Sequence, residues 1–68
     1  MFIHVSKEIP KTSDDVLVAV WNSKNEEYEL RVDYYNQVIN RWGLDKPNLP
    51  VVYWMPIPSI LHLPHPLN

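Results

Sequence analysis

Cysteine is absent from this 68-residue chain, and its absence excludes two of the ways in which small domains are stabilised. No disulfide can form, and no structural zinc site can be built from thiolates. A chain of this length buries only about 60% of its unfolded surface, so a single core leaves it marginally stable. Oligomerisation is the common means of stabilisation that remains, and we therefore expect a homo-oligomer.

The chain also lacks a basic cluster and a long apolar run. Six Lys and Arg residues are spread among eight Asp and Glu residues, for a net charge of −2, so nucleic acid is not an expected partner. No apolar run approaches the ~18 residues of a transmembrane helix, and residues 1–5 are too short for a signal-peptide core. We expect a cytoplasmic protein that does not bind membranes, in keeping with the lack of cysteine.

Glycine occurs once, whereas there are seven prolines, three Trp, four Tyr and one Phe. The run 51–54 consists of β-formers, and Pro56 and Pro58 follow it, so a strand is predicted whose pairing ends near Pro56. Because side chains alternate along a strand, Tyr53 and Trp54 are predicted on opposite faces. Trp54 is the expected central core ring, which leaves the Tyr53 ring in need of another cover.

Two further runs predict the middle of a sheet. Residues 16–21 are apolar at every position, which indicates a central strand covered on both faces. Residues 28–34 alternate strictly, so their apolar side chains are predicted to face the core and their charged ones the solvent. Residues 22–26 have the length and composition of a hairpin loop between these two strands.

The remaining segments predict shorter elements. Residues 2–5 form a short strand in this interpretation, and residues 6–10 a single helical turn that Ser6 caps. Residues 38–42 are predicted as a strand after a turn at residues 36–37, with a helix over residues 33–42 as the weaker alternative.

Together these patterns predict a mainly β fold. We expect a small single-domain antiparallel sheet of four or five strands, with at most one short helical turn, over residues 1–58. The residues expected in its core are Val16, Val18, Leu30, Val32, Val52, Trp54 and Met55.

Residues 59–68 form a tail that is aliphatic where a disordered tail would be polar. The tail contains no charged side chain, and its prolines favour an extended conformation. It either packs along its own domain or docks on a partner subunit, and the small core favours the partner. The residues expected to make this oligomer contact are Ile60, Leu61, Leu63 and Leu67.

The chain resembles a family of small bacteriophage and prophage proteins that closes with Trp-Met-Pro-Leu-Pro. The family opens with Trp-Ile-x-Val, followed by Leu-Pro and then Val-Leu-Val. The corresponding segments here are 2–5 (Phe-Ile-His-Val), 9–10 (Ile-Pro), 16–18 (Val-Leu-Val) and 54–58 (Trp-Met-Pro-Ile-Pro). Phe2 and Ile57 depart from the family pattern, and the tail lies outside the resemblance. The resemblance implies a small β-rich phage-type protein in the host cytoplasm, with no established activity to inherit.

Catalytic and metal sites are not expected. The serines lie in turns and linkers, without the neighbouring His and carboxylate that a nucleophile needs. Glu29 and Asp33 share a strand face with Arg31, which is typical of a solvated row of charges rather than of an acid–base pair. His62 and His65 have a metal-like spacing, which His4 would complete if the termini met, but Pro64 holds the tail extended. We expect no metal, no cofactor and no enzymatic activity.

The density of aromatic rings exceeds what one face of a small sheet can bury. Some rings should therefore reach a pocket or an interface, where a base stacks well and an Arg holds a phosphate. This favours a non-enzymatic protein that sequesters a nucleotide-like ligand, such as a host-defence signal, in a pocket of an oligomer. The alternative is a protein–protein interaction module that binds a host protein or only self-assembles. The expected ligand-binding residues are Trp21, Arg31, Tyr35, Arg41, Trp42 and Tyr53.

Overall fold

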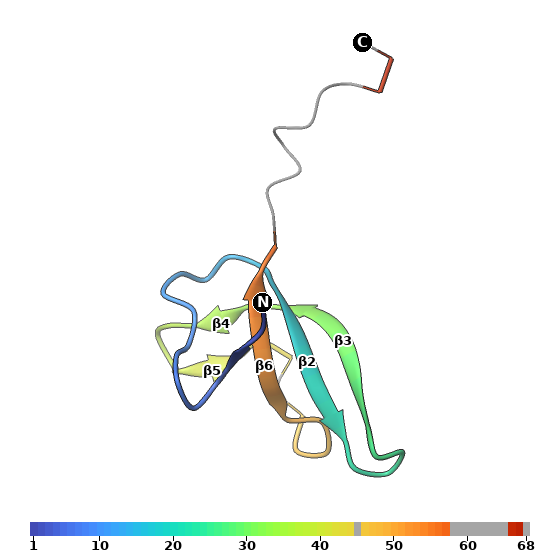
Figure 1. Ribbon diagram of the computed structural model, residues 1–68. Helices are drawn as coiled ribbons and strands as arrows, with labels where there is room; N and C mark the ends of the chain where they lie inside the picture. Colours follow the sequence, from blue (N-terminus) through green and yellow to red (C-terminus); the bar gives the residue numbers. More distant parts are fainter. Residues whose placement is uncertain (45, 58–65, 68) are drawn as a thin grey trace.

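The computed structural model describes residues 1–44, 46–57 and 66–67, and within them the chain forms six strands and no helix (Figure 1). The strands are β1 (Ile3–His4), β2 (Val16–Asn22), β3 (Glu27–Asp33), β4 (Tyr35–Asn36), β5 (Arg41–Trp42) and β6 (Val51–Pro56).

Four of the strands make one antiparallel sheet in the order β1-β6-β2-β3, and β4 and β5 make a separate two-stranded sheet. The β2–β3 hairpin pairs Val16 with Asp33 at one end and Asn22 with Glu27 at the other. On its other side β2 pairs with β6, with a bulge after Ala19. The predicted fold class, a small mainly β antiparallel domain, is confirmed.

One face of the four-stranded sheet, here called the covered face, carries the core. Val16, Val18 and Val20 project from β2 onto this face and form a buried cluster with Trp54. Val18 is 1% exposed and Trp54 is 5% exposed. The predicted core roles of Val16, Val18 and Trp54 are confirmed, and Trp54 is the large ring at the centre.

Three segments without long strands cover this face. The first is residues 6–15, here called the strap, where the Glu8 carbonyl accepts a hydrogen bond from Trp54 Nε1 at 2.9 Å. The second is the β4–β5 hairpin, whose Gln37 side chain donates to the Pro10 carbonyl of the strap at 2.6 Å. The third consists of residues 43–44 and 46–50, here called the 43–50 loop, in which residue 45 is not described. Trp42 and Leu49 pack from the last two segments against the core cluster.

The opposite face, here called the open face, is not covered by any residue that the structure describes. Its side chains come from all four strands: His4, Leu17, Ala19, Trp21, Tyr28, Leu30, Val32, Tyr53 and Met55.

The prediction that Leu30 and Val32 belong to the core is therefore wrong for the single chain. Leu30 is 62% exposed and Val32 is 53% exposed. The predicted alternation along β3 holds, but the apolar side of the strand points to the open face. The strand that we expected to be covered on both faces, β2, is covered on one.

Two other predicted core residues also lie outside the core cluster. Met55 pairs with Leu17 on the open face, where it is half-buried. Val52 lies at the bulge in β6, and its neighbour Val51 packs against the cluster instead. The bulge inserts one residue into β6, which shifts the side-chain alternation there by one position.

The short elements differ from the predictions in their bounds. Residues 38–42 do not form one strand, because residues 37–40 turn and only Arg41–Trp42 pairs with Tyr35–Asn36. Pairing of β6 ends at Pro56, opposite Val16, as predicted. Residues 5–7 make a turn rather than a helix, so Ser6 does not cap a helical turn. The backbone N–H of Ser6 instead donates a hydrogen bond to His4 Nδ1 at 3.1 Å.

Of the tail, the structure describes residues 66–67. Ile60, Leu61 and Leu63, which were predicted as oligomer contacts, lie outside the described residues, and Leu67 is 87% exposed. None of the described residues belongs to a helix that is long and apolar enough to span a membrane.

Candidate functional site

Four aromatic rings form a continuous row across the open face. His4 on β1 contacts Tyr53 on β6 edge-on, with ring centroids 5.1 Å apart. Tyr53 contacts Tyr28 on β3 at 5.7 Å, and Tyr28 contacts Trp21 on β2 at 4.9 Å. All three contacts are edge-to-face, the geometry that the ring quadrupoles favour. The row links all four strands of the sheet.

Ala19 explains how rings from non-adjacent strands meet. Its strand, β2, lies between β6 and β3, and Ala19 pairs with Tyr53 on one side and Leu30 on the other. Because Ala19 has only a methyl group, the rings of Tyr53 and Tyr28 reach one another across β2. Ala19 is only 6% exposed although it lies on the open face, as expected for a residue covered by neighbouring side chains of that face.

Aliphatic side chains fill the rest of the open face. Leu17 and Met55 are half-buried, whereas Leu30 and Val32 are more than half exposed. Among the described strand residues, no Asp, Glu, Lys or Arg projects onto this face. The open face is thus a continuous apolar and aromatic surface without formal charge.

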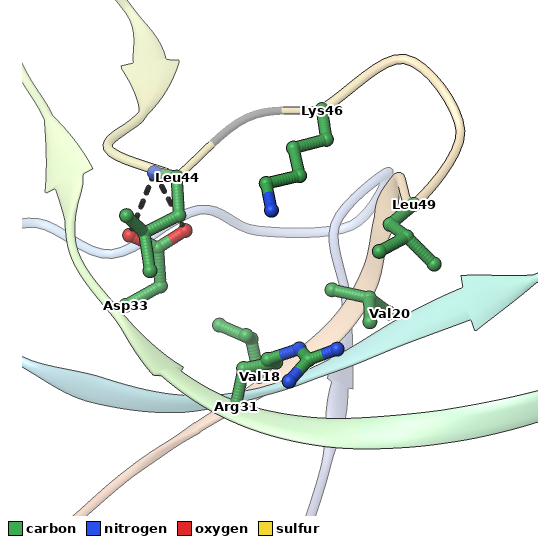
Figure 2. Close-up of a pocket in the computed structure, with 7 residues that line it drawn as sticks. All are labelled: Val18, Val20, Arg31, Asp33, Leu44, Lys46 and Leu49. Carbon is green, nitrogen blue, oxygen red and sulfur yellow. Dashed lines mark hydrogen bonds between the residues drawn. The ribbon is translucent and has the colours of Figure 1, made fainter.

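The covered side holds a polar pocket of about 220 Å³, between the sheet and the 43–50 loop (Figure 2). Its lining residues are Val18, Val20, Arg31, Asp33, Leu44, Lys46 and Leu49.

Asp33 is the anchor of this pocket and not part of a solvated row of charges, which corrects the prediction for it. Asp33 is 3% exposed. Its carboxylate accepts the backbone N–H of Tyr34 at 2.7 Å, and both of its oxygens accept the N–H of Leu44, at 3.1 and 3.2 Å. These bonds satisfy the buried carboxylate and fix the start of the 43–50 loop. Arg31 pairs with Glu29 at the rim, as the prediction of charge pairing on this strand face implies.

The six predicted ligand-binding residues do not form one pocket within a single chain. Trp21 and Tyr53 lie on the open face, whereas Arg31 lies on the covered side. The other three belong to the β4–β5 hairpin, and a second small pocket of about 200 Å³ is lined there by Tyr34, Asn36, Ile39, Arg41, Trp42 and Gly43.

The prediction of ligand binding fits Tyr35 least, because Tyr35 is 7% exposed and belongs to the buried part of the chain. Its ring packs edge-on against Trp42, with centroids 5.2 Å apart. Strand β3 ends at Asp33, one residue before the predicted end of the alternation at Tyr34, and Tyr35 begins the next strand. Trp42 in turn packs against the core cluster, which leaves it half-buried.

Several residues of both surfaces escaped the sequence prediction. Lys46 lines the polar pocket but lies in a loop whose composition carries no signal for a site. His4 joins the aromatic row through its pairing with Tyr53, and the apolar character of residues 2–5 was the available signal for a strand there. Asp33 could have been suspected from its position at the end of a strand, where a carboxylate commonly accepts backbone N–H groups.

Metal ligation finds no support in the described part of the chain, where no three His, Asp or Glu side chains come together. His62 and His65 lie outside the described residues.

In comparisons with known proteins, no protein family, curated protein or solved structure matches the chain. The resemblance to the phage family therefore stays a prediction that rests on the four motif segments alone.

Proposed function

We propose that this chain is a non-catalytic interaction module that self-associates as a homodimer through its open face. The observation that carries the proposal is the aromatic row with its aliphatic surround, an apolar surface that extends over all four strands. The occupant that we assign to it is the same face of a second copy.

The size of the open face supports an interface rather than an ordinary surface. The four strands have two, six, seven and seven residues, so at about 3.3 Å per residue and a spacing of about 4.8 Å they span roughly 350 Å². An apolar patch of about 300–600 Å² is the largest on a typical soluble monomer and is often functional. A standard interface buries about 800 Å² per partner, so a further contribution is needed. The aliphatic tail, with Leu67 and the residues before it, is the segment that we assign to that contribution.

The chemistry of the face favours a second copy over a charged partner. A two-fold contact places each surface against itself, so a charged surface would meet its own sign. The open face carries no formally charged side chain and avoids this repulsion. The second argument is stability, because only six hydrophobic residues among those described are buried in the single chain. Covering the open face would give β2 the second apolar layer that its sequence predicts.

A second candidate function, capture of a nucleotide-like ligand, is favoured by the pocket in the β4–β5 hairpin. That pocket combines a guanidinium with aromatic rings, from Arg41, Tyr34 and Trp42. Calorimetry against a panel of nucleotides and cyclic nucleotides tests this candidate. Binding with a dissociation constant well below ~1 mM, lost in Arg41→Met, would support it, and no heat with any member of the panel would remove it.

The dimer is tested by introducing a charge into the open face. Leu30→Lys places an ammonium group in each half of the apolar interface, where its desolvation opposes association. Light scattering after size exclusion is expected to give the wild-type chain twice its 8.1 kDa and the variant 8.1 kDa.

The matched control is Ile39→Lys, because Ile39 is 59% exposed, against 62% for Leu30, and lies in the β4–β5 turn. This variant is expected to keep the dimer mass. A wild-type chain that stays monomeric at all concentrations would contradict the proposal, and so would equal loss of association in both variants. A version that ends at Ser59 separates the contribution of the tail from that of the sheet face.

A further inference from the structure

We propose that the pocket between the sheet and the 43–50 loop binds a small organic acid that also carries a hydrogen-bond donor, of the size of an amino acid. The pocket lies on the covered side of the sheet, so it stays on the outside of a dimer formed through the open face. The proposal therefore does not depend on the dimer.

Two cations approach the pocket from different segments. Lys46 extends into it from the loop, and Arg31 approaches from β3 on the opposite side (Figure 2). Arg31 donates through one Nη atom to Glu29 and keeps further N–H donors, since a guanidinium has five. The Lys46 ammonium has no hydrogen bond or ion pair with any described residue. Together the two groups are suited to hold one carboxylate.

Asp33 adds a requirement that a simple anion would not meet. Its carboxylate lines the same pocket and would repel an anionic group placed beside it. The Oδ2 atom accepts one bond, from Leu44, and has a second lone-pair site for a donor from a ligand. A ligand with an ammonium or hydroxyl group on the Asp33 side and a carboxylate toward Lys46 satisfies both ends.

The floor and the size of the pocket set the body of the ligand. Val18, Val20 and Leu49 contribute aliphatic surface to its lining (Figure 2). The volume of about 220 Å³ is smaller than the ~300–1,000 Å³ of pockets for drug-sized ligands. It accommodates a short aliphatic chain with its head group and is small for a nucleotide.

Three probes that share an unbranched pentyl chain and differ in its head groups test this assignment. Norleucine carries both the carboxylate and the ammonium, hexanoate lacks the ammonium, and pentylamine lacks the carboxylate. Each is titrated into the full-length chain while backbone amide shifts are followed by NMR. We expect saturable shifts at the Leu44 and Leu49 amides, with norleucine bound about tenfold or more tightly than either single-group probe.

Lys46→Met tests the site itself, because it keeps the length of the side chain and removes the charge. This variant is expected to bind norleucine about tenfold more weakly. Lys24→Met, in the exposed β2–β3 turn, is the matched control and is expected to bind norleucine as the wild type does.

Three results would overturn the proposal. The absence of saturable shifts with norleucine would remove the site. Equal weakening in Lys46→Met and Lys24→Met would show non-specific charge attraction. Equal affinity for norleucine and hexanoate would show that Asp33 does not select a donor.

Discussion

The two faces of the four-stranded sheet differ in what covers them more than in how apolar they are. The covered face buries Trp54 and three valines beneath the strap, the β4–β5 hairpin and the 43–50 loop. The open face carries more aromatic rings, yet in the single chain Tyr28, Leu30 and Val32 are each at least half exposed. The difference shows that alternation along a strand identifies an apolar face but does not decide whether the same chain covers it.

Strand β3 shows the difference within one element. The charged side chains of β3 lie on the covered face. There Asp33 is buried and accepts backbone N–H groups, while Arg31 and Glu29 pair with one another. The apolar side of the strand faces outward. β3 is one of the two edge strands of the sheet. Its polar side chains on the covered side can therefore reach the 43–50 loop and the solvent, which those of an inner strand could not.

The largest expected effect comes from substituting two neighbouring residues of β6 whose side chains lie on opposite faces of the sheet. Trp54→Ala removes the central core ring and the hydrogen bond to Glu8, so it should lower the free energy of unfolding by ~3–5 kcal/mol at every protein concentration. Tyr53→Ala removes a ring from the open face, so its cost should come mainly from association and shrink on dilution. Urea unfolding at several protein concentrations measures both.

The same comparison would fail if the two variants behaved alike. An unchanged midpoint for Trp54→Ala would remove the central role of that ring. A concentration-independent cost for Tyr53→Ala would place Tyr53 in the core of the single chain.

A smaller effect is expected at Gly43, the one glycine of the chain. A Cβ atom there would overlap the ring of Tyr34, which packs over the glycine. Gly43→Ala should therefore destabilise the chain by ~1–3 kcal/mol through overpacking. Thermal unfolding of the single variant and of Gly43→Ala with Tyr34→Ala tests the cause, because removing the ring should recover most of the loss. No recovery would show that the ring is not the obstacle.

The smallest of these effects is expected at Asp33, whose carboxylate holds the 43–50 loop by accepting the N–H of Leu44. Asp33→Ala leaves the N–H groups of Tyr34 and Leu44 without their partner and is expected to cost ~1–2 kcal/mol. Amide hydrogen exchange at Leu44 should accelerate in this variant. Exchange at Val18 in the centre of β2 should accelerate only as much as the lower free energy of global unfolding requires. Val32→Ala, the adjacent residue on the open face, is the control and should leave Leu44 exchange unaltered relative to the global rate.

Much of the sheet was predictable because it follows from local patterns. Alternation assigned Tyr53 and Trp54 to opposite faces, and β-branched runs located β2 and β6. Alternation does not say which face is covered, since that depends on contacts between distant residues. The strap is held by Trp54 and Glu8, which are 46 positions apart, and the loop by Asp33 and Leu44, which are 11 apart. Leu30 and Val32 were therefore misplaced although their shared face was correct.

The candidate surfaces were predictable to a different extent. The excess of rings indicated that some must lie outside the core, and the open face contains Trp21, Tyr28 and Tyr53. Their grouping with Arg31 failed because the guanidinium projects from the opposite side of the same sheet. Lys46 could not be predicted, since its position over the sheet depends on the path of the 43–50 loop.

The most direct test of the central claim is isotope-filtered NMR on a mixture of labelled and unlabelled chains. Methyl groups of Leu17, Leu30, Val32 and Met55 are then observed for magnetisation transfer from protons of another chain. Our account expects intermolecular transfer to these methyls and none to those of Val16 and Val18, which face the core of their own chain. Transfer confined to the outer backbone edge of β3, or no intermolecular transfer at any concentration, would contradict it.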